Sequence, residues 1–343
     1  MYNISQKCIT PYYYNLLILA GVGGIHPGER KHMKVGLIDV DGHNFPNLPL
    51  MKLSAWHKQQ GDQVEMYSPM FSGHVDRVYM SKVFSFTPDY QYCIDADEII
   101  KSGTGYDYPK GGKPLKPEIE HIYPDYGLYN ITDTAYGFLT RGCPRHCSFC
   151  IVGDKEGLVS RKVADLSEFW RGQKNIELLD PNLLACKDHK ELLQQLINSK
   201  ATVNINQGAD CRLLTEDNIN LLKQIRLSKI HFAWDKYEQE NIVIPKLRLY
   251  KQMTDCDMRK TIVYVLTNYN SAFEEDLERV YKIREVGMSP YIMIYDKKTA
   301  SKNVKQLARW VNNRFIWFSN LTMKFDDYLD KQGGIKKNEN ESG

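Results

Sequence analysis

Residues 134–150 read TAYGFLTRGCPRHCSFC, and this stretch determines both the expected fold and the expected chemistry of the chain. Its first part, 134–140, is a short, mostly apolar run that predicts a strand. Directly after that strand, Cys143, Cys147 and Cys150 follow the spacing C-x3-C-x2-C. Three cysteines grouped this closely in a long chain indicate a metal site rather than a disulfide framework.

From this strand onward, strand and helix patterns alternate regularly. We expect strands at 134–140, 175–180, 202–208, 229–235, 259–268 and 289–296, and helices at 165–172, 189–199, 215–226, 238–253, 271–286 and 303–313. Ser271 and Glu274 form a capping-box pattern at the start of the fifth helix. Six units are fewer than the eight of a closed barrel. Residues 133–315 are therefore expected to form a partial (β/α)6 TIM-like barrel or an open sheet, with ligands at the carboxyl ends of the strands.

A smaller α/β unit precedes this region. Its expected elements are strands at 34–40, 63–67, 75–86 and 98–100 and a helix at 50–60. Strand–helix–strand order predicts a parallel, Rossmann-like domain over residues 33–105. Residues 106–132 are rich in Pro, Gly and Tyr and predict a linker, and residues 316–343 are expected to be an extension that ends in a disordered tail. We hypothesise that Met33 is the native start and that residues 1–32 are a non-native leader.

The composition excludes several classes of protein. The chain has 343 residues, a formal net charge of +3 and 42% hydrophobic residues, which is typical of soluble globular proteins. So small a charge predicts neither a nucleic-acid partner nor a membrane partner. The apolar run 16–25 is too short for a membrane span, which needs about 20 residues. Clustered cysteines without a disulfide framework favour the reducing cytoplasm.

Two kinds of metal centre suit the cysteine cluster. Three thiolates can hold three irons of a 4Fe–4S cluster, and the fourth iron is then open to another ligand. Zinc is the alternative, with His146 as a fourth donor. Because His146 and Cys147 are adjacent, their joint ligation of one tetrahedral ion is awkward, so we expect iron. The scattered cysteines, Cys186, Cys211 and Cys256, are expected to be buried thiols.

With Phe149 included, the pattern C-x3-C-x-aromatic-C resembles the signature of the radical S-adenosylmethionine superfamily. The resemblance covers residues 133–315. It implies that the open iron chelates S-adenosylmethionine. It also implies that an electron from a reductant such as flavodoxin or ferredoxin cleaves this molecule to methionine and a 5′-deoxyadenosyl radical, which takes hydrogen from a substrate that the sequence does not identify. A non-catalytic zinc- or cluster-binding module stays open as an alternative.

Polar residues at the predicted strand ends are candidate cofactor contacts. Where the superfamily often has Gly-Gly-Glu, this chain has Asp180 and Asn182. The full set of candidates is Phe149 beside the cluster and Asp180, Asn182, Gln207, Asp210, Asp235 and Asn268 at strand ends. The resemblance implies that the fifth and sixth strand ends approach adenosine. Tyr291, Met293 and Tyr295 alternate on one face of the sixth strand, which is more typical of core packing.

The N-terminal unit resembles a cobalamin-binding domain in two details. Gly103-Thr104-Gly105 follows a short strand, and Asp41-Gly42-His43 begins a D-x-H-x-x-G pattern. Pro46 stands in place of the final glycine, whose backbone freedom proline lacks. We therefore favour a degenerate domain that shapes the substrate cavity, with a cobalamin-dependent radical methyltransferase as the alternative. The related methylthiotransferase branch carries three cysteines in this domain, whereas this chain has only Cys93 there.

Overall fold

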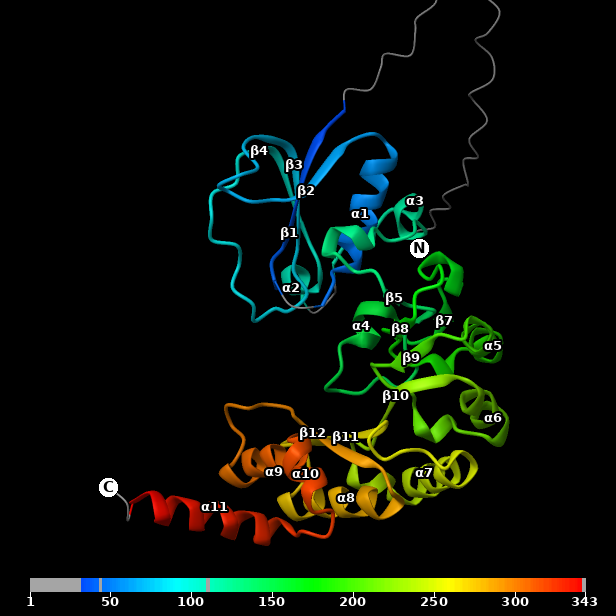
Figure 1. Ribbon diagram of the computed structural model, residues 1–343, viewed down its shortest axis with the longest axis vertical. Coiled ribbons are helices and arrows are strands. Elements are labelled where there is room, and N and C mark those ends of the chain that lie inside the picture. Colours follow the sequence, from blue (N-terminus) through cyan, green and yellow to red (C-terminus); the bar gives the residue numbers. More distant parts are fainter. Residues whose placement is uncertain (1–31, 43–44, 109–111, 341–343) are drawn as a thin grey trace, which may run out of the picture.

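The computed structural model describes residues 32–42, 45–108 and 112–340, and side chains as far as residue 332. The hypothesised leader, apart from residue 32, and His43 of the D-x-H-x-x-G pattern lie outside the described residues. The described chain is a mixed α/β protein with two parallel sheets, an N-terminal one and a larger one that follows it (Figure 1). Within the described residues, every helix is too short or too polar to cross a membrane.

The N-terminal sheet has the strand order β2-β1-β3-β4, and all its pairs are parallel. Its elements are β1 (Lys34–Asp39), α1 (Leu48–Gln59), β2 (Gln63–Met66), β3 (Val75–Ser81), β4 (Ala96–Ser102) and α2 (Thr104–Asp107). Helix α1 begins where Asn47 accepts a hydrogen bond from the Leu50 N–H at 3.3 Å. Leu50 and Leu53 of this helix pack against Val35 and Leu37 of β1. The strand order changes direction beside β1, as in Rossmann-like sheets.

The larger sheet has the order β12-β11-β10-β9-β8-β5. Its strands are β5 (Thr134–Gly137), β8 (Asn175–Leu178), β9 (Thr202–Ile205), β10 (Arg226–Ala233), β11 (Thr261–Thr267) and β12 (Ser289–Ile294). Its helices are α5 (His189–Ser199), α6 (Glu216–Gln224), α7 (Glu240–Thr254), α8 (Phe273–Val286) and α9 (Lys302–Asn312). Every pair is parallel and neighbours in space follow the chain order.

Sequential strand order places the helices on one face of this sheet. Each right-handed crossover moves one strand in the same direction, so successive helices cover the same side. Figure 1 shows α5 to α9 along the outer side of the strands. Alternate strand residues such as Ile176, Val203, Phe232 and Val263 are buried in the main core. These helices do not cover the opposite face of the sheet.

Three expectations for the elements need correction. The helix expected at 165–172 is only the 3-10 turn η2 (Leu166–Glu168), because Phe169 leaves helical geometry and packs over Gly137. Helix α8 starts at Phe273, and Ala272 N–H donates to Glu275 at 2.9 Å, so the capping residues are shifted by one. In place of a disordered tail, α10 (Arg314–Ser319) and α11 (Phe325–Asn340) follow α9. They form because Trp317, Phe325 and Tyr328 pack around Trp310.

Candidate functional site

A two-stranded ribbon holds the base of the cysteine loop, which we define as residues 142–151. Strand β6 (Thr140–Arg141) pairs antiparallel with β7 (Arg161–Lys162), and the loop and α4 (Val152–Glu156) lie between them. Gly142 has φ +88°, and a side chain there would meet the Val159 carbonyl oxygen at 2.2 Å. Cys143 N–H donates to the Gly157 carbonyl at 3.1 Å. The glycine therefore lets the chain turn tightly into the cysteines.

The three cysteine thiols influence one another. Cys143 and Cys147 are half-buried, and Cys150 is exposed. Burial raises the pKa of the Cys147 thiol, and the Asp235 carboxylate and the other two thiols raise it further. Burial and neighbouring negative charge also raise the pKa of Cys150. These effects disfavour the thiolate forms of Cys147 and Cys150.

The donor arrangement bears on the choice between zinc and iron. Among the residues that the structure describes, no three His, Cys, Asp or Glu side chains converge so as to hold a single metal ion. Zinc needs donors at about 2.0–2.3 Å around one point. A 4Fe–4S cluster takes each thiolate on a different iron, so its ligands do not converge. The preference for iron therefore rests on the sequence, in which His146 and Cys147 are adjacent.

Asp180 lies beyond β8 and supports the start of the ribbon. Its carboxylate is 1% exposed and accepts hydrogen bonds from Leu139 N–H at 3.1 Å, Thr140 N–H at 2.5 Å and the Thr140 hydroxyl at 2.7 Å. Burial raises its pKa to about 6, although these hydrogen bonds oppose the rise. These contacts make Asp180 an anchor of the strand end, and its contact with a cofactor stays a prediction.

Asn182 is buried against the cysteine loop. Its Nδ2 lies 3.5 Å from the Cys143 sulfur, within hydrogen-bonding distance for sulfur. The side chain is 3% exposed, and its Oδ1 has no hydrogen-bond partner within the described part of the chain. An unpartnered buried amide oxygen is costly. Asn182 therefore presents a free acceptor directly beside a candidate ligand.

Asp210, beyond β9, ties the cysteine loop to the sheet. It forms ion pairs with Arg145, which lies between Cys143 and Cys147, and with Arg212 at 2.6 Å. Burial by itself would raise the pKa of Asp210, but the two guanidinium groups outweigh burial and lower it. Gln207 is exposed at the same strand end. Sequence reasoning missed Arg145, although a cation inside a thiol-rich loop was a readable signal.

Asp235, two residues beyond β10, faces the same loop. Burial raises its pKa to about 6, and Arg279 and Arg212 offset this rise only in part. The same carboxylate raises the pKa values of Cys147 and Cys150. The structure thus brings Asp235 beside the candidate ligands and gives the site a second negative group.

Phe149 and Asn268 are linked through a residue that sequence reasoning missed. The Phe149 ring meets the Tyr269 ring edge-on, with centroids 5.4 Å apart, and Ser148 Oγ lies 2.6 Å from Tyr269 Oη. Asn268 donates through Nδ2 to the Asp296 carbonyl at 2.9 Å and to Thr299 Oγ1 at 3.1 Å. The signal for Tyr269 was its position directly after Asn268 at a strand end.

The face of the larger sheet away from the helices is not an apolar core. Tyr291, Met293 and Tyr295 are 40%, 45% and 53% exposed, so the expectation of core packing for them was wrong. Their strand is the sheet edge, and helices cover only its other face. The His231 and Tyr264 rings stack with centroids 5.1 Å apart on the neighbouring strands. The rings of Tyr264, Tyr291 and Tyr295 form an aromatic surface on this face, which we call the aromatic wall. It extends toward Tyr269 at the site.

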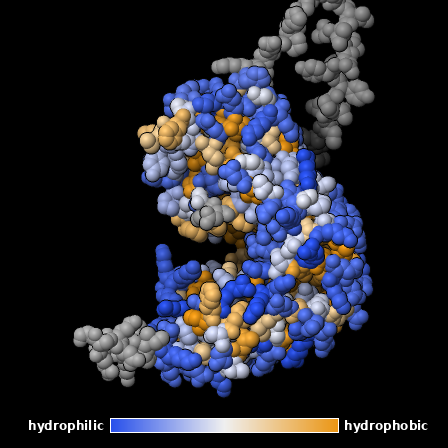
Figure 2. Space-filling view, in the orientation of Figure 1, coloured by the Kyte–Doolittle hydropathy of each residue, from blue (hydrophilic) through white to orange (hydrophobic). Residues whose placement is uncertain are grey.

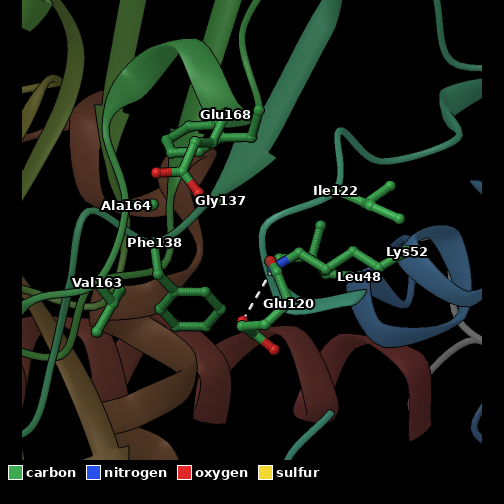
Figure 3. Close-up of a pocket in the computed structure, with 10 residues that line it drawn as sticks. Leu48, Lys52, Glu120, Ile122, Gly137, Phe138, Val163, Ala164 and Glu168 are labelled. Atoms are coloured by element: carbon green, nitrogen blue, oxygen red, sulfur yellow. Dashed lines mark hydrogen bonds and ion pairs between the residues drawn. The ribbon is translucent and has the colours of Figure 1, made fainter. Parts of the chain in front are cut away.

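Cavities locate the open parts of the molecule. Figure 2 shows the surface hollowed between the N-terminal unit and the larger sheet region. A small cavity of about 20 Å³ lies where the two units meet, and Lys52 and Glu120 form an ion pair of 2.9 Å beside Phe138 (Figure 3). This volume holds about one water molecule. A larger groove of about 570 Å³ borders Trp170, Lys174 and Arg226, at the amino ends of the strands and away from the cysteines.

Contacts within the N-terminal domain involve two of the features that resemble a cobalamin site, Asp41 and Gly103. Asp41 accepts hydrogen bonds from Val83 N–H at 2.5 Å and the Thr87 hydroxyl at 2.7 Å, so the chain itself occupies the carboxyl ends of β1 and β3. A side chain on Gly103 would lie 2.2 Å from the Lys82 carbonyl oxygen. The glycine turn is thus explained by close packing within the domain, and no step is assigned to a corrinoid.

Comparisons with known proteins add one partial similarity. No family model matches the chain. A CDK5RAP1-like protein of Oryza sativa subsp. japonica is 34% identical in an alignment of 95 residues that covers 25% of this chain. The chain spans 16% of the length of that curated relative.

Proposed function

We propose that this chain is a radical S-adenosylmethionine enzyme that binds a 4Fe–4S cluster through Cys143, Cys147 and Cys150 and acts in the cytoplasm. A cluster bound there supplies the electron that cleaves S-adenosylmethionine to methionine and a 5′-deoxyadenosyl radical, which abstracts hydrogen from a substrate. A low-potential carrier such as flavodoxin or ferredoxin delivers the electron. The similarity to the CDK5RAP1-like protein, a radical SAM family member, supports the proposal.

One observation carries it. A loop with the three thiols of Cys143, Cys147 and Cys150 follows the first strand of six parallel strands in sequential order. Ligands of such sheets bind at the carboxyl ends of the strands. The sequential order supports a partial (β/α)6 barrel over residues 133–315, with the domain at 33–105 shaping the substrate cavity.

The chain's own residues then bind and orient S-adenosylmethionine. We expect Asn182, whose buried Oδ1 has no hydrogen-bond partner within the described residues, to accept a hydrogen bond from the amino group. We expect Asp235, whose carboxylate lies beside the cysteine loop, to attract the cationic sulfonium group. Gln207 and the exposed aromatic wall at Tyr291 and Tyr295 remain for adenosine or substrate.

Anaerobic reconstitution tests the proposal. The full chain is loaded with iron and sulfide, reduced with dithionite, and given S-adenosylmethionine. We expect a 4Fe–4S absorption and EPR spectrum and formation of 5′-deoxyadenosine. Cys147→Ala should lose the stable cluster, whereas Cys93→Ala, which changes an exposed cysteine outside the loop, should keep it.

Three results would count against the proposal. Stoichiometric zinc in the purified protein without any iron uptake would favour a zinc-binding module. A complete cluster in Cys147→Ala would refute the ligand assignment. An intact, reducible cluster that never cleaves S-adenosylmethionine would favour a cluster-binding module without turnover.

A further inference from the structure

The tip of the cysteine loop touches a residue from the far side of the sheet. Ser148 and Phe149, which stand between Cys147 and Cys150, both contact Tyr269. Tyr269 follows β11, which is separated from β5 by β8, β9 and β10 in the strand order. Since the loop starts beyond β5, this contact spans the carboxyl ends of the strands between β5 and β11, which we call the mouth of the sheet.

The turn that contains Tyr269 has a fixed backbone conformation. Asn268 and Asn270, on either side, have φ values of 57° and 49°. Such left-handed conformations are unfavourable for most residues and tolerated best by glycine and asparagine. Asn268 is fixed by its two hydrogen bonds to the segment after β12, and the Tyr295 ring lies 4.7 Å from the Tyr269 ring. Tyr269 is therefore mounted on a well-anchored turn.

The loop needs such a contact because its tip has few bonds of its own. The base is held where Gly142 N–H donates to the Glu156 carboxylate of α4 and Cys143 N–H donates to the Gly157 carbonyl. Farther along, Cys150 N–H donates to the Cys147 carbonyl at 2.9 Å, a bond within the loop that does not fix it to the sheet. The Arg145–Asp210 ion pair holds the middle of the loop. The Tyr269 contacts are what connect the segment between the last two cysteines to the strand ends.

We propose that Tyr269 is a positioning residue that locks the cysteine loop across the mouth of the sheet before any metal binds, with Ser148 as its hydrogen-bond partner. The purpose of this lock rests on the proposed function, since a preorganised loop presents its thiolates without an ordering cost at the moment of cluster binding. The lock itself is a property of the metal-free chain. Tyr269 also connects the loop to the exposed aromatic wall through Tyr295.

Hydrogen exchange of the metal-free, full-length protein tests the lock. Tyr269→Phe removes the hydroxyl and keeps the ring, and Ser148→Ala removes the same hydrogen bond from an exposed position. In each variant we expect the amides of residues 145–151 to exchange about tenfold faster, as the loss of one hydrogen bond predicts. The double variant should exchange no faster than either single variant, because both changes remove one bond.

The controls separate this lock from general damage. Tyr291→Phe changes an aromatic residue of β12 whose ring contact is with Tyr264, and it should leave exchange in the loop unchanged. Exchange of β9 should be unchanged in all variants, which shows that the fold is intact. Unchanged loop exchange in both single variants, or effects that multiply in the double variant, would overturn the proposal. Because no metal is present, failure of the wild-type chain to assemble a cluster would refute the proposed function and leave this result standing.

Discussion

The carboxylate of Asp180 accepts hydrogen bonds from both the N–H and the hydroxyl of Thr140, 40 residues earlier in the chain. This contact joins the end of β8 to the ribbon that carries the cysteine loop. The carboxylate is buried, and its pKa is raised to about 6. The raised pKa predicts that this connection between the sheet and the loop depends on pH.

Asp180→Asn should change how stability varies with pH. A folded-state pKa above the ordinary 3.8 means that the native protein keeps a proton that the unfolded chain loses as pH rises from about 4 to 6. Wild-type stability then falls by up to about 3 kcal/mol from this group across that range. Asparagine does not titrate and has fewer acceptor sites, so the variant should be less stable than the wild type at pH 4.5. The difference in unfolding free energy between the two proteins should become smaller toward pH 7. Urea unfolding at several pH values checks this, and a gap independent of pH would contradict it.

Asp210→Asn should loosen the cysteine loop. The change leaves the guanidinium groups of Arg145 and Arg212 without their buried carboxylate, and we expect a loss of about 1–3 kcal/mol in unfolding free energy. Asp217→Asn is the matched control, because Asp217 pairs with Lys190 in an exposed ion pair and should cost less than about 1 kcal/mol. Thermal unfolding and iron uptake of both variants measure the difference. Equal effects would show that Arg145 does not depend on Asp210.

The sequence predicted the six strands of the larger sheet because local apolar periodicity is enough to locate strands. It placed strand ends too late, as at 175–180, where β8 ends at Leu178 and Asp180 turns back to Thr140. It also found the three cysteines, since their signal lies in eight consecutive residues. The contacts of Arg145 with Asp210 and of Ser148 with Tyr269 join positions far apart in the chain. Spacing along one sequence cannot indicate such contacts, because they depend on the packing of the whole sheet.

Asn182→Ala should lower the reduction potential of the bound cluster. The Asn182 amide N–H donates toward the Cys143 sulfur, and such hydrogen bonds stabilise the more negative, reduced state. Loss of a bond worth about 0.5–1.5 kcal/mol corresponds to a shift of about 20–60 mV to more negative potential for one electron. Redox titration followed by EPR measures the shift. Asn218→Ala, at another buried asparagine that caps α6, should reduce stability and leave the potential unchanged.

Gly142→Ala should disrupt the entrance to the cysteine loop. At φ +88°, any side chain is strained, and the new Cβ would also lie 2.2 Å from the Val159 carbonyl oxygen, which belongs to backbone and cannot simply rotate away. Gly172→Ala separates the two effects, because Gly172 has φ +94° and no atom within 4 Å of the added Cβ. We expect Gly172→Ala to cost about 1 kcal/mol in unfolding free energy from backbone strain alone, and Gly142→Ala to cost more and to reduce iron uptake as well. If both variants lost the same stability and bound iron equally well, the close contact with Val159 would have no part in shaping the loop.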